Sequence, residues 1–371
     1  MPPFRLISRL LSKNLPFAVY RLPGTGEITF LVQLSQQENV FQTDKLANQK
    51  GFIIAPFDAY KTGEIRLIKP DIVAGKAKEY QQLLAAIDHL PDQEISFPQK
   101  QNFFIDKPAY LQQVKQLVGS MKNGEAAKVV LSRVLKKPLP SAFDFDTFFE
   151  QLEEKYPAAF VYFFHLPGEG YWAGATPETL LKQDDGFLET MALAGTRKLS
   201  SGKQMQPWEQ KEKEEQAFVT EFVEKQIQNL GIENYEKRPV ETLFAGNLAH
   251  LCTRFRFAVK GQETKTGLFA KALHPTPAVG GLPQRQALQL IEKTEKHRRH
   301  YYTGFLGPWQ VKNQQHLFVN LRCARFLENS MEIYAGGGLT PASLPEKEWQ
   351  ETEDKAQTLL SVVEKLRNFA P

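Results

Sequence analysis

The sequence predicts a mixed α+β fold built on antiparallel sheet, and three observations support this prediction. Strand-like and helix-like segments interleave along the chain with no internal repeat. Three strand-like runs between residues 158 and 195 are separated only by turns, which is typical of an antiparallel sheet. The chain of 371 residues is 42% hydrophobic and 24% charged, and such a composition is typical of a globular protein with a sizeable core.

The N-terminal third is expected to be rich in strands. It contains short apolar or alternating runs with β character at residues 25–34, 50–58 and 64–73. A polar, proline-bearing stretch at residues 92–108 then marks a boundary. We therefore divide the chain into an N-terminal β-rich part, residues 1–105, that belongs to the same fold, and a core that spans residues 106–371.

Helices and strands alternate in the remainder of the chain. A helix is expected from Lys107, because apolar residues recur at helical spacing as far as Met121. Another should run from Pro207 to Leu230, with Gly231 at its stop. Further helices are expected at residues 144–155, 282–296 and 345–367, with a short surface helix at the chain start. Strands are expected at residues 128–135, 254–261, 301–311, 316–326 and 331–339.

Charge and cysteine content exclude several classes of protein. The 46 basic and 42 acidic residues give a net charge of +4, which suits a small anionic ligand weakly and indicates no nucleic acid. The basic run at residues 297–300 is interpreted as a solvated helix end. Only Cys252 and Cys323 are present, too few for a disulfide framework, so we expect a reducing cytoplasm. No apolar run could cross a bilayer, and basic residues interrupt any signal peptide. We therefore expect a cytoplasmic monomer with neither a nucleic-acid nor a membrane partner.

Acidic residues extend the apolar stripes of two predicted helices. In the helix from Pro207, stepping back along the stripe reaches Glu215. In the last helix, Glu348 and Glu351 share one side with Lys355. Oxygen donors from two helices suit Mg²⁺, which binds few protein carboxylates together with water and an anionic substrate. The alternative is that these acids stabilise helix N-termini and form a surface ion pair.

Two glycine turns and two cationic residues are further candidates for a site. The turns at residues 193–196 and 335–338 each end a β-like run, where backbone amides can approach an anion closely, although most such glycines only make turns. Arg322 is predicted inside an apolar strand, where it either extends to solvent or binds a carboxylate. Lys128 opens a strand, a position that is by itself unremarkable. Nucleotide-binding glycine loops, a GxSxG motif and zinc-binding CxxC or HExxH motifs are all missing from the sequence.

Several strings match one known family in the correct order between about Tyr110 and Leu366. They read KVVLSR, GATPETLL, LAGT, ALHPTPAVGGLP, GFLGPW, LRCARF and AGGGLTPASLPEKEWQETEDKAQTLL. In these strings the chain resembles the chorismate-binding enzymes, and among them the isochorismate synthases. The resemblance implies antiparallel sheets in an α/β/α sandwich, a cleft between them that holds the active site, and reversible isomerisation of chorismate to isochorismate.

The resemblance also implies the role of each site residue. Lys128 would activate the water that attacks C2 of chorismate, and Glu178 would protonate the departing C4 hydroxyl. Both roles require the uncharged side chain, which burial favours. Glu215 and Glu351 would hold Mg²⁺, with Glu348 bound directly or through water, and Glu214 is the alternative to Glu215. The implied substrate-binding residues are Gly195, Thr196, His250, Arg322, Gly336, Gly338 and Lys355.

The motifs also separate members of the family. Anthranilate and aminodeoxychorismate synthases carry an amide at the position of Lys128 and use ammonia, whereas enzymes that add water resemble this sequence in having lysine. The HPTPA string is similar to isochorismate synthases and unlike salicylate synthases, which also eliminate pyruvate. A salicylate synthase remains the second hypothesis, and a chorismate-binding protein without catalysis the third. The use of the product, in menaquinone, siderophore or salicylate synthesis, is left open.

Overall fold

The structure of the protein is a computed structural model. It describes residues 5–95, 97–98, 103–140, 143–198, 207–245, 248–259, 261 and 264–369. Of the helices in these ranges, none has the length and hydrophobicity that a bilayer crossing requires.

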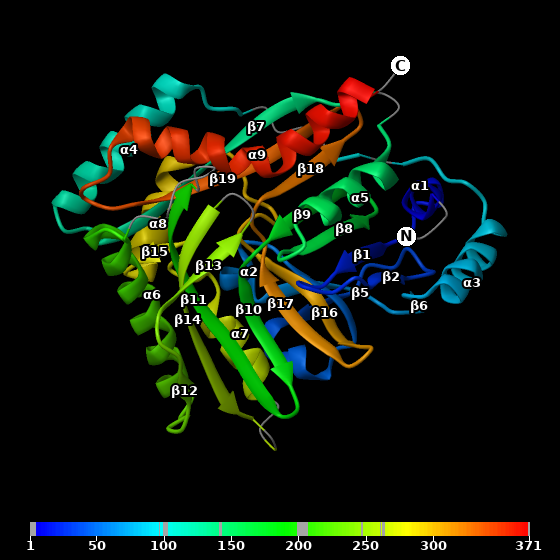
Figure 1. Ribbon diagram of the computed structural model, residues 1–371, viewed down its shortest axis with the longest axis horizontal. Coiled ribbons are helices and arrows are strands. Elements are labelled where there is room, and N and C mark those ends of the chain that lie inside the picture. Colours follow the sequence, from blue (N-terminus) through cyan, green and yellow to red (C-terminus); the bar gives the residue numbers. More distant parts are fainter. Residues whose placement is uncertain are drawn as a thin grey trace.

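Two antiparallel sheets form the centre of the molecule (Figure 1). Within the described residues the first sheet has nine strands. Their order is β15 (Gly281–Leu282), β7 (Lys128–Pro138), β19 (Ser330–Leu339), β18 (Cys323–Leu327), β9 (Gly170–Thr176), β8 (Phe160–Leu166), β1 (Phe17–Arg21), β2 (Ile28–Val32) and β6 (Ile72–Ala74). In the second sheet the order is β12 (Glu236–Lys237), β14 (Leu248–Ala258), β11 (Phe187–Lys198), β10 (Thr179–Asp184), β17 (Gln314–Val319), β16 (Phe305–Val311), β4 (Gly51–Ala55), β5 (Glu64–Ile68) and β3 (Val40–Gln42), with β13 (Glu241–Ala245) also paired to β14.

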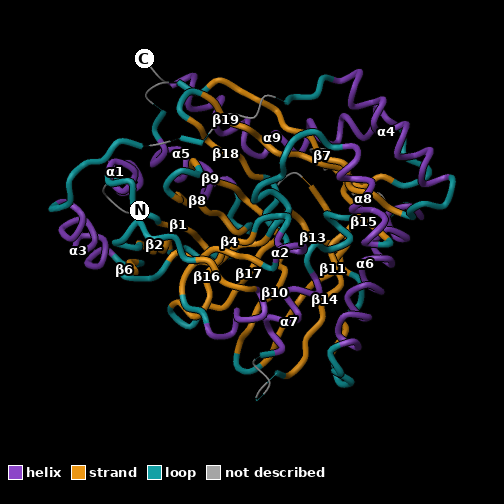
Figure 2. Tube along the Cα trace, turned by 180° about the vertical axis from the view of Figure 1, so that it is seen from behind, coloured by secondary structure: helices purple, strands orange, loops and turns teal. Residues whose placement is uncertain are grey.

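Helices cover the outer faces of both sheets (Figure 2). They are α1 (Leu6–Ser12), α2 (Ala59–Thr62), α3 (Ala77–Asp88), α4 (Lys107–Lys122), α5 (Phe145–Lys155), α6 (Gln210–Asn229), α7 (Lys265–Leu273), α8 (Gln284–Thr294) and α9 (Pro345–Phe369), with a 3₁₀ turn, η1, at Thr43–Asn48. One apolar core lies between the first sheet and α1, α3, α5 and α9. A second lies between the other sheet and α6 and α7.

A third core, rich in aromatic residues, lies between the two sheets. Alternate residues of a strand point to opposite faces, so Val19 packs under the helices while Tyr20 packs against the second sheet. The predicted antiparallel α+β sandwich is confirmed, and its sheet layer is double. The segment 1–105 contributes strands to both sheets, since β1 pairs with β8 and β4 pairs with β16.

The chain passes from one sheet to the other at two points that matter for the site. Strand β9 ends at Thr176 and β10 begins at Thr179 in the second sheet, so Glu178 lies in the crossing. Strand β17 returns to β18 across residues 320–322. The two crossings are bonded to each other, because Val319 N donates to Glu178 O at 2.9 Å and Ala175 N donates to Arg322 O at 3.3 Å.

Two sequence expectations are wrong in this region and its surroundings. Arg322 does not lie inside a strand: its φ is +50°, a left-handed conformation that turns the chain between the sheets. Residues 297–300 do not form a solvated helix end, because α8 ends at Thr294 and Arg299 is 3% exposed. Its counter-ion is the buried carboxylate of Glu295, four residues earlier.

The predicted helices are otherwise present with small shifts at their ends. The helix expected from Lys107 is α4, with Asp106 as N-cap accepting from Ala109 N at 3.0 Å. The helix expected from Pro207 begins at Gln210 and buries Val219, Val223 and Ile227, whereas Phe218 is exposed.

Candidate active site

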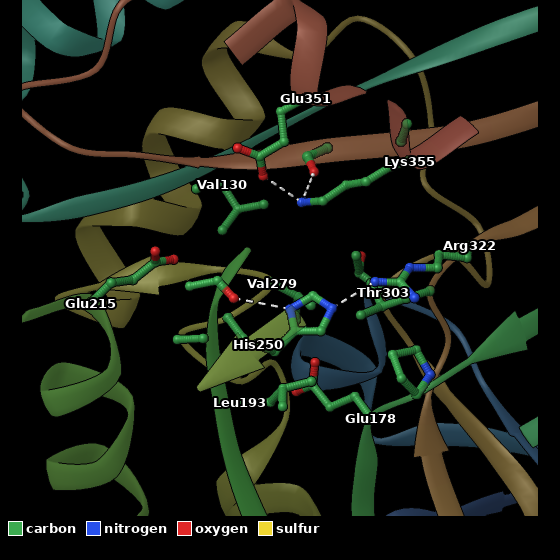
Figure 3. A pocket seen from close by; sticks show the side chains of 18 of the residues that line it. Val130, Glu178, Leu193, Glu215, His250, Val279, Thr303, Arg322, Glu351 and Lys355 are labelled. Carbon is green, nitrogen blue, oxygen red and sulfur yellow. Dashed lines mark hydrogen bonds and ion pairs between the residues drawn. The ribbon is translucent and has the colours of Figure 1, made fainter. Parts of the chain in front are cut away.

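A cavity of about 240 Å³ lies at the two crossings between the sheets. Its walls come from β7, β11, β14 and β19, from the first turns of α6 and α9, and from both crossings. Figure 3 shows Glu351 and Lys355 on one side of this cavity and Glu178 on the opposite side, with His250 and Arg322 between them. The cavity therefore brings together residues as distant in the sequence as Val130 and Lys355.

Glu178 is the buried acid of the cavity. Its side chain is held by the crossing from β9 to β10 and the residue is 3% exposed. Burial raises the pKa of this carboxyl to about 8, against the opposing effect of the positive charges on Lys128, Arg322 and Lys355. Glu178 is therefore protonated at pH 7 and can donate a proton to a group inside the cavity.

His250 and Arg322 form a fixed polar wall. The imidazole Nδ1 of His250 donates to the carbonyl oxygen of Gly195 at 3.0 Å, and Nε2 lies 2.8 Å from Nη2 of Arg322. A guanidinium is a donor only, so Nε2 accepts and the ring is neutral. Burial, Arg322 and Lys355 lower the pKa of His250 to about 3, in agreement with that tautomer. Arg322 is thereby oriented by a neutral partner and keeps its charge for an anion.

A backbone irregularity places Gly195 for this contact. The pairing of β11 with β14 shifts register between Ala194 and Arg197. Gly195 has φ +67°, a conformation that favours glycine. A Cβ there would lie 3.2 Å from Cβ of Glu212, whose carboxylate accepts two bonds from Arg197 at 2.9 and 3.0 Å. The predicted LAGT turn is thus a bulge within a strand that presents its carbonyl to His250.

Lys355 and Glu351 enter from the first turns of α9. Nζ of Lys355 donates to Oε1 of Glu351 at 2.7 Å and to the carbonyl oxygen of Gly336 at 2.8 Å. The pair has the i,i+4 spacing that the sequence predicted. Because both side chains retain partial exposure to the cavity, the ammonium is available to an anionic ligand.

Lys128 and Glu215 form a second ion pair beside the cavity. Nζ of Lys128 donates to Oε1 of Glu215 at 2.7 Å, and the Lys128 side chain is 1% exposed. Gly338 makes room for the pair, since a Cβ there would lie 2.9 Å from Cε of Lys128 and 3.0 Å from Oε1 of Glu215. The structure favours Glu215 over Glu214 as the inward acid, because Glu214 is exposed and accepts from Gln210.

Three carboxylates surround the glycines of β19. A Cβ on Gly337 would lie 3.2 Å from Oε2 of Glu348 and 3.6 Å from Oε1 of Glu351, while Glu215 lies at Gly338. Oxygen donors of this kind suit a hard cation. Among the described residues, no group of three His, Cys, Asp or Glu side chains has the geometry to hold a metal ion.

Most of the sequence-predicted site residues line the cavity. They are Glu178, Gly195, Glu215, His250, Arg322, Gly336, Gly338, Glu351 and Lys355. Lys128 and Glu348 are buried immediately behind this lining, at Gly338 and Gly337 respectively. Thr196 follows the bulge in β11, and its side chain lies outside the described residues.

Sequence reasoning missed part of the lining. The additional residues include Val130, Leu193, Ala278, Val279, Tyr302, Thr303, Leu321, Tyr334 and Lys347. Several of them lie inside or beside strings already quoted, such as ALHPTPAVGGLP for Val279, so position next to a motif was an available signal. Tyr334 also precedes a quoted string directly and Tyr302 lies two residues before another, but their residue type gave no further signal, because aromatic residues are as common in a core.

A family model and several known proteins match this chain. The family model described as chorismate binding enzyme matches residues 53–364. Isochorismate synthase EntC of Escherichia coli K12 is 29% identical over 265 residues, which cover 69% of this chain and 67% of that protein. Isochorismate synthase MenF of Haemophilus influenzae is 27% identical over 290 residues, 75% of this chain and 65% of that protein.

Solved structures show the same fold. The structure titled as a putative 2,3-dihydroxybenzoate-specific isochorismate synthase, DhbC, from Bacillus anthracis is 23% identical and aligns with a TM-score of 0.78 over 97% of this chain and 99% of that one. Anthranilate synthase component I from Streptococcus pneumoniae aligns with a TM-score of 0.68 at 17% identity, over 92% and 89% of the two chains.

Proposed function

Because the chain belongs to the family of chorismate-binding enzymes, we propose that it is an isochorismate synthase, an isomerase that converts chorismate reversibly to isochorismate. The names of its relatives EntC and MenF support this activity over that of the anthranilate synthases. The observation that carries the proposal is the cavity itself, in which a protonated, buried Glu178 faces the cations Arg322 and Lys355. Chorismate is a dianion that must lose a hydroxyl group. The cavity offers cations that can bind its carboxylates and an acid that can protonate the departing hydroxyl.

The cations and the backbone of β19 orient the substrate. Residues 335–338, which the sequence predicted as a turn, lie within that strand. Arg322, fixed by His250, and Lys355, fixed by Gly336 O, would bind one carboxylate, together with backbone amides near Gly338. A guanidinium binds a carboxylate through two parallel bonds, which sets orientation as well as affinity. Binding in one orientation is what places C2 and C4 of the ring between base and acid.

Lys128 and Glu178 carry the proton transfers. Lys128 would act as the base toward the water that adds at C2, and Glu178 would give its proton to the C4 hydroxyl as the C4–O bond breaks. The ring double bonds shift, and one water is gained and one lost, so substrate and product have the same formula. In the reverse direction the two residues exchange roles.

We propose that Glu215, Glu348 and Glu351 come together around Mg²⁺ when it binds, since their carboxylates are not gathered as metal ligands without it. All three carboxylates border Gly337 and Gly338, and two of them accept a bond from an ammonium group at the cavity edge. When bound, the ion supplies positive charge that offsets the ring carboxylate of the substrate. Without it, this acidic side of the cavity repels a dianion.

Product analysis tests the proposal. Purified protein is incubated with chorismate and Mg²⁺, and the product is identified by mass and absorbance. The expected product has the mass of chorismate, with no pyruvate and no aminated product when ammonium salts are added. Stoichiometric pyruvate would instead establish a salicylate synthase, and binding without conversion would establish a non-catalytic binder.

A further inference from the structure

Arg299 and Glu295 form a buried ion pair outside the cavity, and two hydrogen bonds join their charged groups. Nη2 of Arg299 donates to Oε1 of Glu295 at 2.6 Å, and Nε donates to Oε2 at 2.8 Å. Both side chains are less than 5% exposed, and the guanidinium lies 4.4 Å from the centre of the Phe57 ring. Neither residue lines the cavity. A buried pair of this kind is stable only when its remaining donors and acceptors are also satisfied.

The pair completes the outer edge of β7. Strand β15 pairs with β7 only at Lys128 and Val129. Beyond that point the carbonyl oxygen of Val130 accepts from Nη2 of Arg299 at 2.8 Å, and the amide of Ser132 donates to Oε1 of Glu295 at 2.7 Å. Buried backbone groups without a partner destabilise the fold. The two side chains therefore take the place of a missing neighbouring strand.

The same guanidinium reaches a second wall of the cavity. Nη1 of Arg299 donates to the carbonyl oxygen of Val279 at 2.8 Å. Val279 and Val130 both line the cavity, on different segments. The loop that carries Val279 also bonds to β7 through Gly280 O and Val130 N at 3.1 Å. One buried side chain thus ties two walls of the cavity to each other.

We propose that Arg299 and Glu295 are positioning residues for the reaction. They hold β7, which carries Lys128 two residues before Val130, in a fixed relation to the loop at Val279. The proposal rests on the proposed function for its kinetic consequence. A misplacement of about 1 Å can cost on the order of 10²-fold in rate without contact to the substrate.

Arg299→Lys tests this role, with Arg298→Lys as the matched control on the exposed neighbour. A lysine keeps the charge but cannot reach Val130 O, Val279 O and Glu295 together. With chorismate, at a temperature well below the Tm of each variant, we expect kcat of Arg299→Lys to fall roughly 10–100-fold while KM changes by less than about threefold. Arg298→Lys keeps both constants. An unchanged kcat in folded Arg299→Lys, or a loss confined to KM, overturns the proposal.

A double variant guards against misfolding caused by a lone buried charge. Arg299→Met with Glu295→Met removes both charges, so no ion is left without its partner. We expect the same loss of kcat and faster hydrogen exchange at the amide of Ser132, whereas exchange in Arg298→Lys is unchanged. Unaltered exchange at Ser132 in the double variant overturns the claim that the pair completes β7. Failure of the wild type to convert chorismate overturns the proposed function alone, because the exchange measurement needs no substrate.

Discussion

Glu178 and Glu295 are both buried glutamates, yet they are in opposite protonation states. Burial raises the pKa of Glu178 to about 8, since the positive charges on Lys128, Arg322 and Lys355 oppose the effect of burial only in part. Burial also acts to raise the pKa of Glu295, but contact with Arg299 and the bond from Ser132 keep that pKa below its ordinary value. One carboxyl is consequently an acid at neutral pH and the other is a permanent anion.

The difference shows what separates the carboxyl that we propose as the catalytic acid from a structural one in this fold. Glu295 has its oxygens filled by bonds from Arg299 and Ser132, so its charge stabilises a strand edge. Glu178 is placed by a backbone crossing and faces the cavity, so its proton is available to a substrate. Environment assigns the two roles, since the residue type is the same.

The largest expected effect comes from removing the acid. Glu178→Gln fills the same space but cannot give a proton to a leaving hydroxyl, and general acids typically contribute about 10²–10⁴-fold. Turnover should fall by that factor from chorismate and from isochorismate alike, with the equilibrium ratio unchanged. Glu328→Gln, on an exposed glutamate, is the control. Near-normal turnover of Glu178→Gln in either direction would show that Glu178 does not donate the proton, and the proposed difference in role from Glu295 would be wrong.

Glu351 differs from both of these glutamates, because it is partly exposed beside the glycines of β19. Its replacement should change the Mg²⁺ dependence of turnover. Glu351→Gln is expected to raise the Mg²⁺ concentration needed for turnover by at least the roughly 10–100-fold seen when outer-shell metal partners are lost. Glu346→Gln is the matched control, because Glu346 lies on the same helix and pairs with Lys107 at 2.8 Å. EDTA should abolish wild-type turnover and Mg²⁺ should restore it. Equal behaviour of the two variants would show that Glu351 holds no metal.

The pH dependence of turnover should report Glu178. Only the protonated form acts as acid, so above a pKa of about 8 the rate should fall by about tenfold for each further pH unit. The measurement is kcat between pH 6 and pH 10 with chorismate saturating. A rate that stays level through this range would mean that the proton comes from another group.

The smallest effect is on stability, and the two glutamates should give opposite signs. The native pKa of Glu178 is raised, so its stabilising contribution is complete below pH 4.5 and is lost as the pH rises to about 8, by about 1.4 kcal/mol for each pKa unit of the shift. Glu178→Gln should therefore gain stability relative to the wild type over this window. The native pKa of Glu295 is lowered, so its contribution is present above pH 4.5 and is lost as the pH falls. Urea unfolding of the wild type, Glu178→Gln and Glu295→Gln from pH 4 to pH 9 measures both contributions. Differences in unfolding free energy from the wild type that change with pH in the same direction for the two variants would contradict the assignment.

The sequence predicted the helices and the inward acids because both depend on local spacing. The i,i+4 pair of Glu351 and Lys355 is an example, since helical geometry alone brings these side chains together. The stripe in α6 likewise identified Glu215 rather than Glu214. The proposal of Lys128 and Glu178 as the catalytic pair depended on resemblance, because the two residues are distant in sequence and each is unremarkable alone.

The crossings between the sheets could not be predicted from hydrophobic pattern. An apolar run reads alike in either sheet, so residues 316–326 gave no indication that the chain changes sheet at Arg322, in a left-handed conformation. Arg299 was misinterpreted for a related reason, since a basic run is usually solvated. Its partner Glu295, four residues earlier, was the available signal, but a buried ion pair depends on tertiary packing.

The central claim, that Glu178 is protonated inside the cavity at neutral pH, can be measured directly by infrared difference spectroscopy. Spectra of the wild type minus Glu178→Gln are recorded from pH 5 to pH 10 without substrate. The account predicts a carbonyl band of a protonated carboxylic acid at pH 7 that disappears with a midpoint of about 8. A carboxylate band already complete at pH 6, with no protonated form, would contradict it.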